Sequence, residues 1–187
     1  GCELMGCEPQ ENHWPAVIRR VREIYHGPVT YNANQYHPGK PFVRKWFSEL
    51  DLLGVSFYTG TTRPDPTATE LAEDLQPSVD ALEAVVRETG VPLFFAECGS
   101  RSVVGGTLQP WMYYNEGDYD GESQANYLAG VVRAFSSCPW WKGLMWWKWD
   151  EQQKRPHYTQ PHGDTGFTIH GKPAAQVMKR WCAGEEL

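Results

Sequence analysis

The sequence predicts an α/β fold in which a parallel sheet is covered by helices. Short apolar segments alternate along the 187 residues with longer segments of helical periodicity, and strands joined through helices run parallel. A second observation favours a (β/α)8 TIM barrel over an open sheet. Polar or aromatic residues stand where the predicted strands end, which is the face of such a barrel that carries chemistry. These residues are Glu3, Asn34, Tyr58, Glu97 and Trp149.

Four strands are predicted from short segments rich in apolar, β-branched and aromatic residues. The second of them is apolar on both faces, as expected for a strand buried between a barrel interior and outer helices. The strands are expected at residues 29–34, 52–58, 91–99 and 143–149. Glu3 follows Gly1-Cys2, and we expect these first residues to form the tip of one further strand.

Helices are predicted between the strands, where apolar residues recur three and four positions apart. Asn12 is a candidate N-cap for the first helix, which Gly27-Pro28 should end. Pro77 should start a new helix in its first turn, and Gly90 should close that helix. Helical spacing covers residues 14–25, a short turn at 45–50, and residues 71–86, 127–135 and 174–181.

Composition and charge narrow the classes of partner. The net charge is −6 and no run of Lys or Arg exceeds two residues, which argues against nucleic acid or an acidic membrane surface as the partner. No apolar segment approaches the roughly 18 residues that a membrane-spanning helix needs. The five cysteines form no C-x-x-C pair, so neither a disulfide scaffold nor a cysteine metal site is indicated.

Several common catalytic motifs are missing from the sequence. It contains no G-x-G-x-x-G, no G-K-[ST], no H-E-x-x-H and no G-x-S-x-G, so the usual signatures of nucleotide, zinc-protease and serine-hydrolase sites are absent. His157 and His162 share a loop with Asp164, but their spacing matches no common metal motif. We therefore expect neither a metal nor a cofactor.

Glu97 and Glu3 are the strongest candidates for catalytic residues. Glu97 ends an apolar strand, and a carboxylate at that position requires either a function or a structural ion pair, for example with Arg101. Two carboxylates at strand ends suit glycoside hydrolysis: one protonates the leaving oxygen, and the other attacks the anomeric carbon or activates water. Their separation, which distinguishes retention from inversion, is not encoded in the spacing.

The aromatic residues indicate a sugar substrate. The sequence has 9 Trp, and five of them crowd the last strand and its approach. Flat rings stack on the C–H face of pyranoses, while the indole N–H can serve a hydroxyl. Trp149 is our choice for the sugar platform, and Trp111 stands in a long aromatic loop of the kind that is usually functional. Packing in the core is the alternative for Trp140, Trp146 and Trp147.

The order of these motifs resembles clan A glycoside hydrolases, and glycoside hydrolase family 113, the β-mannanases, most closely. The segments that look like the seventh and eighth barrel strands and their loops are residues 92–102, 109–111, 124–125 and 143–149. Those that look like strands four to six are residues 1–4, 14, 21–22, 25–34 and 46–51. The likeness covers nearly the whole chain and ends at residues 171–174.

The resemblance implies that residues 1–187 are the C-terminal half of a single catalytic domain, with roughly strands 5 to 8 and the tip of strand 4. It implies a retaining, endo-β-1,4-mannanase-like glycosidase with Glu97 as the nucleophile and Glu3 as the acid/base. Tyr58 would hydrogen-bond the nucleophile, and Asn34 would line the sugar site. The other substrate-binding residues that we expect are Trp149, Trp111 and Trp147.

One residue departs from the clan pattern, and two alternatives stay open. Cys2 stands directly before Glu3, where many clan members have an Asn that donates to the sugar 2-hydroxyl. This departure leaves the choice of sugar open. We expect a β-1,4-linked polysaccharide or oligosaccharide, with mannan first and cellulose, xylan or β-glucan as alternatives. The alternative to an enzyme is a non-catalytic, carbohydrate-binding half-barrel. Because a half-barrel leaves strand edges open, we expect a missing N-terminal half or a second copy to close the sheet.

Overall fold

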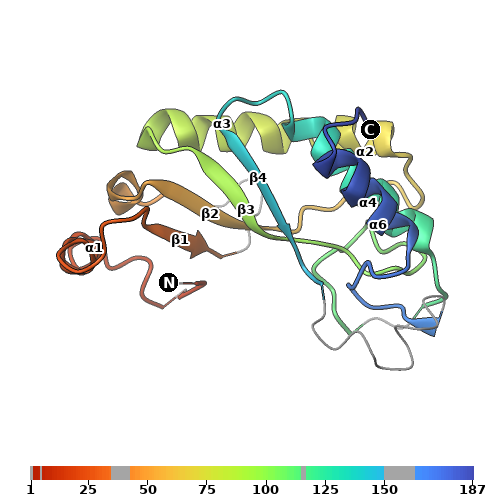
Figure 1. Cartoon of the computed structure of the whole chain (residues 1–187), viewed down its shortest axis with the longest axis horizontal. Coiled ribbons are helices and arrows are strands. Elements are labelled where there is room, and N and C mark those ends of the chain that lie inside the picture. Colours follow the sequence, from red (N-terminus) through yellow and green to blue (C-terminus); the bar gives the residue numbers. More distant parts are fainter. Residues whose placement is uncertain (1, 5, 35–42, 115–116, 150–162) are drawn as a thin grey trace.

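A four-stranded parallel sheet forms the centre of the computed structural model, which describes residues 2–4, 6–34, 43–114, 117–149 and 163–187 (Figure 1). The strands are β1 (Thr30–Ala33), β2 (Leu52–Phe57), β3 (Leu93–Cys98) and β4 (Trp141–Trp146). They lie in the order β1-β2-β3-β4, so each crossover joins neighbouring strands. This succession of parallel strands and outer helices confirms the predicted fold, a partial (β/α)8 barrel.

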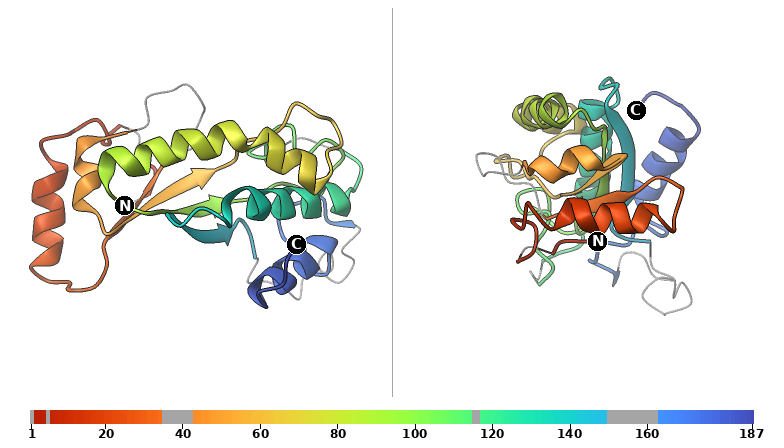
Figure 2. Two further views of the ribbon diagram at one scale, coloured as in Figure 1. Left: turned by 90° about the horizontal axis from the view of Figure 1, so that it is seen from above. Right: turned by 90° about the vertical axis from the view of Figure 1, so that its left-hand side faces the viewer.

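Helices α3, α4 and α6 lie on one side of this sheet (Figures 1 and 2). Pro77 lies in the first turn of α3 and Gly90 ends that helix with a φ of 72°, as predicted. The first helix is shorter than expected: it starts after His13 without a side-chain cap from Asn12 and ends at Arg22. The helical elements are α1 (Trp14–Arg22), η1 (Lys45–Glu49), α2 (Ala68–Asp74), α3 (Gln76–Thr89), α4 (Gly121–Phe135) and α6 (Pro173–Cys182). None of the helices in the described ranges has the length and apolar character to cross a membrane.

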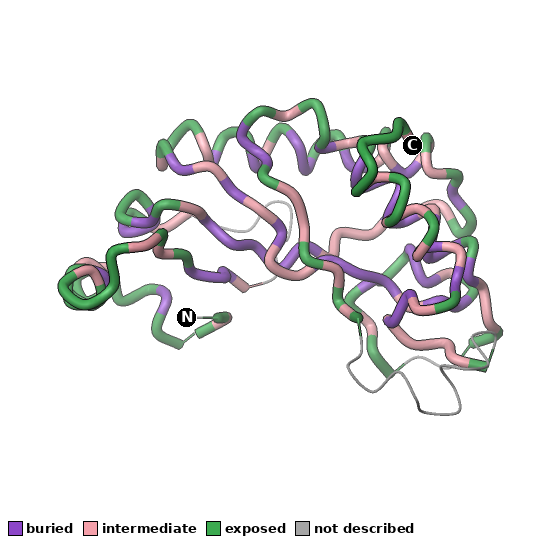
Figure 3. The backbone as a smooth tube through the Cα atoms, in the orientation of Figure 1, coloured by how far each residue is buried: buried purple, intermediate pink, exposed green. Residues whose placement is uncertain are grey.

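The core lies between the sheet and the helices, and β2 is buried almost throughout (Figure 3). Phe57 of β2 stacks on Phe95 of β3 with ring centroids 4.2 Å apart, and Phe135 of α4 packs edge-on against both rings. Trp140 and Trp141 are buried in the same cluster, so Trp140 packs in the core, in agreement with the packing alternative. The five cysteines are free.

The predicted bounds of the last strand are wrong. The strand ends at Trp146, three residues before the predicted tip at Trp149. Its neighbour β3 ends at Cys98, and the Trp147 N–H, one residue past the end of β4, donates to the Cys98 carbonyl. The Lys148 N–H then bonds the Phe167 carbonyl, so the chain leaves the sheet for a loop. Trp149 therefore lies beyond the strand and not at its tip.

Candidate active site

Tyr58 and Glu97 meet at the carboxyl edge of the sheet. Tyr58 directly follows β2 and Glu97 is the fifth residue of β3, and parallel neighbours bring these positions to the same edge. The Tyr58 hydroxyl donates a hydrogen bond to Oε2 of Glu97 at 3.0 Å. Arg101 turns away and donates to the carbonyl and hydroxyl oxygens of Thr165. The hydrogen bond with Tyr58 therefore replaces the Glu97–Arg101 ion pair that was the structural alternative.

Glu3 reaches the same place from the start of the chain. Cys2 forms a single parallel bridge with Asn32 of β1, which is the expected tip of a further strand. The Glu3 N–H donates to the Asn32 carbonyl at 2.8 Å. Glu3 has a φ of 48°, a left-handed conformation that is costly for a residue other than glycine and persists only when its surroundings hold it.

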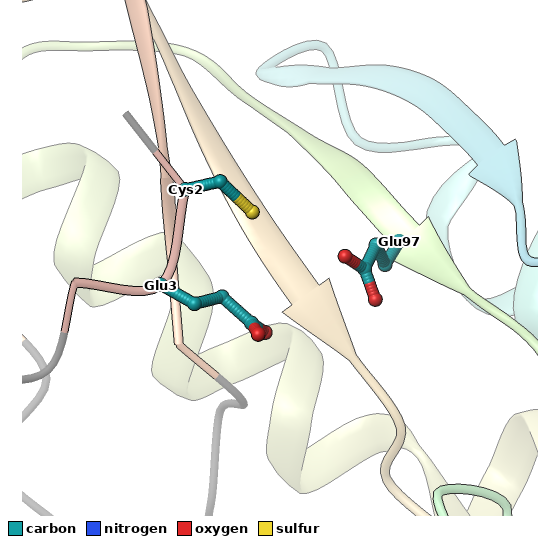
Figure 4. Close-up of side chains that lie close together, drawn as sticks. All are labelled: Cys2, Glu3 and Glu97. Atoms are coloured by element: carbon teal, nitrogen blue, oxygen red, sulfur yellow. The ribbon is translucent and has the colours of Figure 1, made fainter.

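The two carboxylates converge, with the Cys2 sulfur beside them (Figure 4). One carboxylate oxygen of Glu3, one of Glu97 and Sγ of Cys2 all lie within 4.8 Å of one another. Each therefore offers one atom to the same small volume. Because Tyr58, Glu97 and Glu3 come from three separate segments, only the parallel sheet brings them together.

The surroundings of Glu97 disfavour its charge. Burial raises the pKa of its carboxyl, the hydrogen bond from Tyr58 works in the opposite direction, and the nearby Glu3 carboxylate adds to the rise. The pKa of Tyr58 is also raised, first by burial and then by the charge of Glu97. Tyr58 therefore stays protonated and serves as the donor in this pair.

Glu8 is a buried carboxylate that sequence reasoning missed. Its Oε1 accepts a hydrogen bond from the Tyr31 hydroxyl at 2.9 Å and another from the Asn34 N–H at 3.2 Å. The Tyr31 hydroxyl in turn accepts from the Leu4 N–H at 2.8 Å. This chain of bonds fastens the segment after Glu3 to both ends of β1. Neither Glu8 nor Tyr31 stands at the end of a predicted strand, so their positions in the sequence gave no sign of this role.

Asn34 lies where it was expected, just beyond the end of β1 and half-buried. Its backbone N–H is used by Glu8, and its side chain is left for a role that remains a prediction. The predicted tryptophans lie on loops after β3 and β4. Trp111, Trp147 and Trp149 expose 39%, 46% and 58% of their surface, so each keeps ring area free for a ligand. The Trp147 N–H bonds to the Cys98 carbonyl of β3. The Trp149 ring meets His170 edge-on, with ring centroids 5.6 Å apart.

A buried ion pair between Lys172 and Asp164 holds the segment before α6, and no sequence pattern predicted it. Nζ of Lys172 lies 3.0 Å from Asp164 and donates to the Ser102 hydroxyl at 2.8 Å and the Gly166 carbonyl at 3.1 Å. The Gln124 amide adds contacts to the carbonyls of Gly166 and Phe167. Lys172 thereby joins Ser102, in the loop after β3, to Asp164 and Gly166, which follow β4.

Three potential metal-ligand side chains also meet at this edge of the sheet. Cys2, Glu3 and Glu97 are the one group of three potential ligand residues in the described ranges. The expectation that the protein uses no metal or cofactor stays a prediction. His157 and His162 lie outside the described residues. Asp164, which shares their loop, is paired with Lys172.

A parallel sheet with outer helices and two carboxylates at its carboxyl edge places the chain in the class of (β/α)8-barrel glycoside hydrolases. The chain belongs to one particular family of that class. Residues 1–172 match the model of Glycoside Hydrolase Family 113, as the resemblance of its motifs predicted. A comparison with curated protein sequences gave no match.

Solved structures of this family have the same fold. The β-mannanase AaManA from Alicyclobacillus acidocaldarius, solved with ManMIm, is 33% identical with a TM-score of 0.81 over 98% of this chain and 54% of its own. A second β-1,4-mannanase of the family is 27% identical, with a TM-score of 0.78 over 99% and 55%. A β-glucuronidase from Ruminococcus gnavus, 18% identical with a TM-score of 0.58 over 91% and 29%, shares the fold alone. The chain spans about half the length of the mannanases it matches.

Proposed function

We propose that this chain carries the two catalytic carboxylates of a retaining β-mannanase, with Glu97 as the nucleophile and Glu3 as the acid/base. The observation that carries the proposal is the approach of the two carboxylates to within 4.8 Å at the carboxyl edge of the sheet. Retaining glycosidases keep their carboxyl groups about 5 Å apart, whereas inverting enzymes need roughly 6.5 to 9.5 Å to admit a water. The short separation favours retention.

Tyr58 supports the division of roles between the two carboxylates. A nucleophile must be ionised, and the Tyr58 hydroxyl donates a hydrogen bond to an oxygen of Glu97 and so stabilises the anion. The Glu3 carboxylate faces Glu97 from the short segment at the start of the chain, and the Tyr58 hydroxyl bonds to Glu97 and not to Glu3. Glu97 is therefore the carboxylate prepared for attack, and Glu3 is the one that exchanges a proton with the leaving group.

In the first step, Oε of Glu97 forms a bond to the anomeric carbon while the bond to the leaving oxygen breaks. Glu3 gives its proton to that oxygen, so the leaving sugar departs neutral and Glu3 becomes a carboxylate. In the second step, Glu3 takes a proton from a water molecule, and the water oxygen displaces Glu97 from the anomeric carbon. The two inversions leave the configuration unchanged, and both carboxyls return to their starting states.

The substrate class follows from the family and from the aromatic residues. Two solved members of the family are described as β-mannanases, and Trp111, Trp147 and Trp149 keep ring surface available for pyranose stacking. A β-1,4-linked mannan is therefore the first substrate, ahead of cellulose, xylan and β-glucan. Release of reducing ends from the four polymers by the full-length enzyme orders them directly.

Covalent trapping tests the catalytic assignment. A 2-deoxy-2-fluoro mannoside with an activated leaving group should label the enzyme, and peptide mass mapping should place the label on Glu97. A label on any other residue overturns the nucleophile. Glu97→Ala and Glu3→Ala should each lower kcat by at least a hundredfold, roughly, on mannan. Retained binding of mannan with no turnover in the unaltered protein would favour the non-catalytic, carbohydrate-binding alternative.

A further inference from the structure

We infer that Asn32 is a positioning residue that sets where Glu3 lies relative to Glu97, through a polar relay of Cys2, Asn32 and Ser56. The inference rests on the proposed function, because it concerns the same two carboxylates. It adds a residue in the middle of a strand that neither the motifs nor the strand ends indicated.

The side chain of Asn32 joins the Glu3 segment to two strands. Nδ2 of Asn32 donates to Sγ of Cys2 at 3.4 Å and to the hydroxyl of Ser56 at 3.0 Å. Its main-chain carbonyl accepts the Glu3 N–H at 2.8 Å. Asn32 is only 8% exposed and Ser56 is fully buried, so these bonds are shielded from water. Among the described residues, the hydrogen bonds between the short Cys2–Glu3 segment and the sheet all involve Asn32.

The sheet leaves room for this relay at one position. The register partner of Asn32 in β2 is Gly54, which has no side chain between Asn32 and Ser56. A Cβ at Gly54 would lie 3.0 Å from the Tyr31 carbonyl oxygen, so a larger residue there would disturb β1. Ser56 in turn pairs with Glu97 across β2 and β3, directly after a register shift between Val55 and Ser56.

Hydrogen bonds run from Glu3 and Cys2 through Asn32 to Ser56, and Ser56 is the register partner of Glu97 in β3. Glu3 also depends on external support, since its backbone has a φ of 48°. Loss of the Asn32 amide should therefore let Glu3 move while Glu97 keeps its bond to Tyr58. Small displacements of a proton donor have large effects on rate.

The relay acts on proton transfer to the leaving group, which gives a readout that general damage to the fold would not produce. A dinitrophenolate leaves without a proton, whereas a sugar alcohol requires one from Glu3. The experiment compares kcat/KM of the full-length enzyme for dinitrophenyl β-mannobioside and for a mannooligosaccharide, because kcat/KM reports the glycosylation step in both. Asn32→Ala should lower the value for the oligosaccharide about tenfold or more and the aryl value less than about threefold.

Matched variants separate the possible outcomes. Thr30→Ala, at the exposed start of the same strand, should change neither value. Ser56→Ala should show a weaker selective loss, and it decides the question if Asn32→Ala fails to fold. Equal losses on both substrates, or no loss, in these two variants overturn the inference. Glu3→Ala reports on the proposed function by itself: without a selective loss there, the acid/base assignment fails, whereas a selective loss in Glu3→Ala alone rejects only the role of Asn32.

Discussion

The Tyr58 hydroxyl and the Glu97 carboxylate are joined by a hydrogen bond of 3.0 Å across the ends of two neighbouring strands. This contact supplies the one influence on Glu97, in the described residues, that lowers its pKa against burial and the charge of Glu3. A single hydroxyl therefore opposes the rise in the pKa of Glu97, and removal of that hydroxyl should raise the pKa further.

Tyr58→Phe should move the acidic limb of the kcat/KM profile to higher pH. Glu97 must be ionised to attack, so activity falls as the pH drops through its pKa. Removal of the donor raises that pKa further, because the hydrogen bond from Tyr58 favours the ionised carboxylate. Profiles on one mannooligosaccharide measure the shift. Tyr113→Phe, an exposed tyrosine outside the pair, is the control, and an unmoved limb in Tyr58→Phe contradicts the assignment.

Azide should distinguish the two carboxylates by the configuration of the product. With an activated aryl mannoside, Glu97→Ala leaves space for azide to attack the anomeric carbon directly, which gives the α-mannosyl azide. Glu3→Ala still forms the glycosyl-enzyme, and azide then displaces Glu97 to give the β-mannosyl azide. Proton NMR of the products identifies both anomers. The reverse pattern would exchange the roles of Glu97 and Glu3.

Glu8→Ala should destabilise the segment that carries Glu3. The substitution removes the acceptor of the Tyr31 hydroxyl and of the Asn34 N–H, and buried donors left without partners cost about 1–3 kcal/mol. Urea denaturation measures the loss in the free energy of unfolding. Gln10→Ala, at an exposed position two residues away, should leave the midpoint unchanged. A Glu8 variant as stable as the parent would show that these bonds contribute nothing.

Lys172→Met should cost about 3–5 kcal/mol, because it leaves Asp164 as a largely buried charge without its partner. The Lys172 side chain is fully buried and that of Asp164 is 12% exposed, so water cannot replace the lost contact. The double variant Lys172→Met with Asp164→Asn should recover part of the loss, since no charge then remains. Thermal denaturation of the single and double variants tests this, and additive losses would argue against a coupled pair.

The fold was predictable to the extent that local patterns report it. Pro77 and Gly90 act on the backbone of their own helix, so they marked the start and the end of α3 correctly. The end of β4 was not predictable in this way. Trp147 and Trp149 continue the aromatic pattern of the strand. The N–H groups of Trp147 and Lys148, however, bond to the carbonyls of Cys98 and Phe167, and only the position of those carbonyls decides where pairing stops.

The same division holds for the site. The sequence by itself placed Tyr58 and Glu97 at the ends of two strands, and a carboxylate at the end of an apolar strand already marked Glu97. Tertiary structure alone decided which hydrogen bonds support the site and its loops. Asn32 bonds to Ser56, 24 residues away, and Lys172 bonds to Ser102, 70 residues away. Such partners depend on sheet register, including the shift at Val55 and Ser56, and on loops that cross the sheet edge. Register arises from the packing of the whole sheet, so no local pattern contains it.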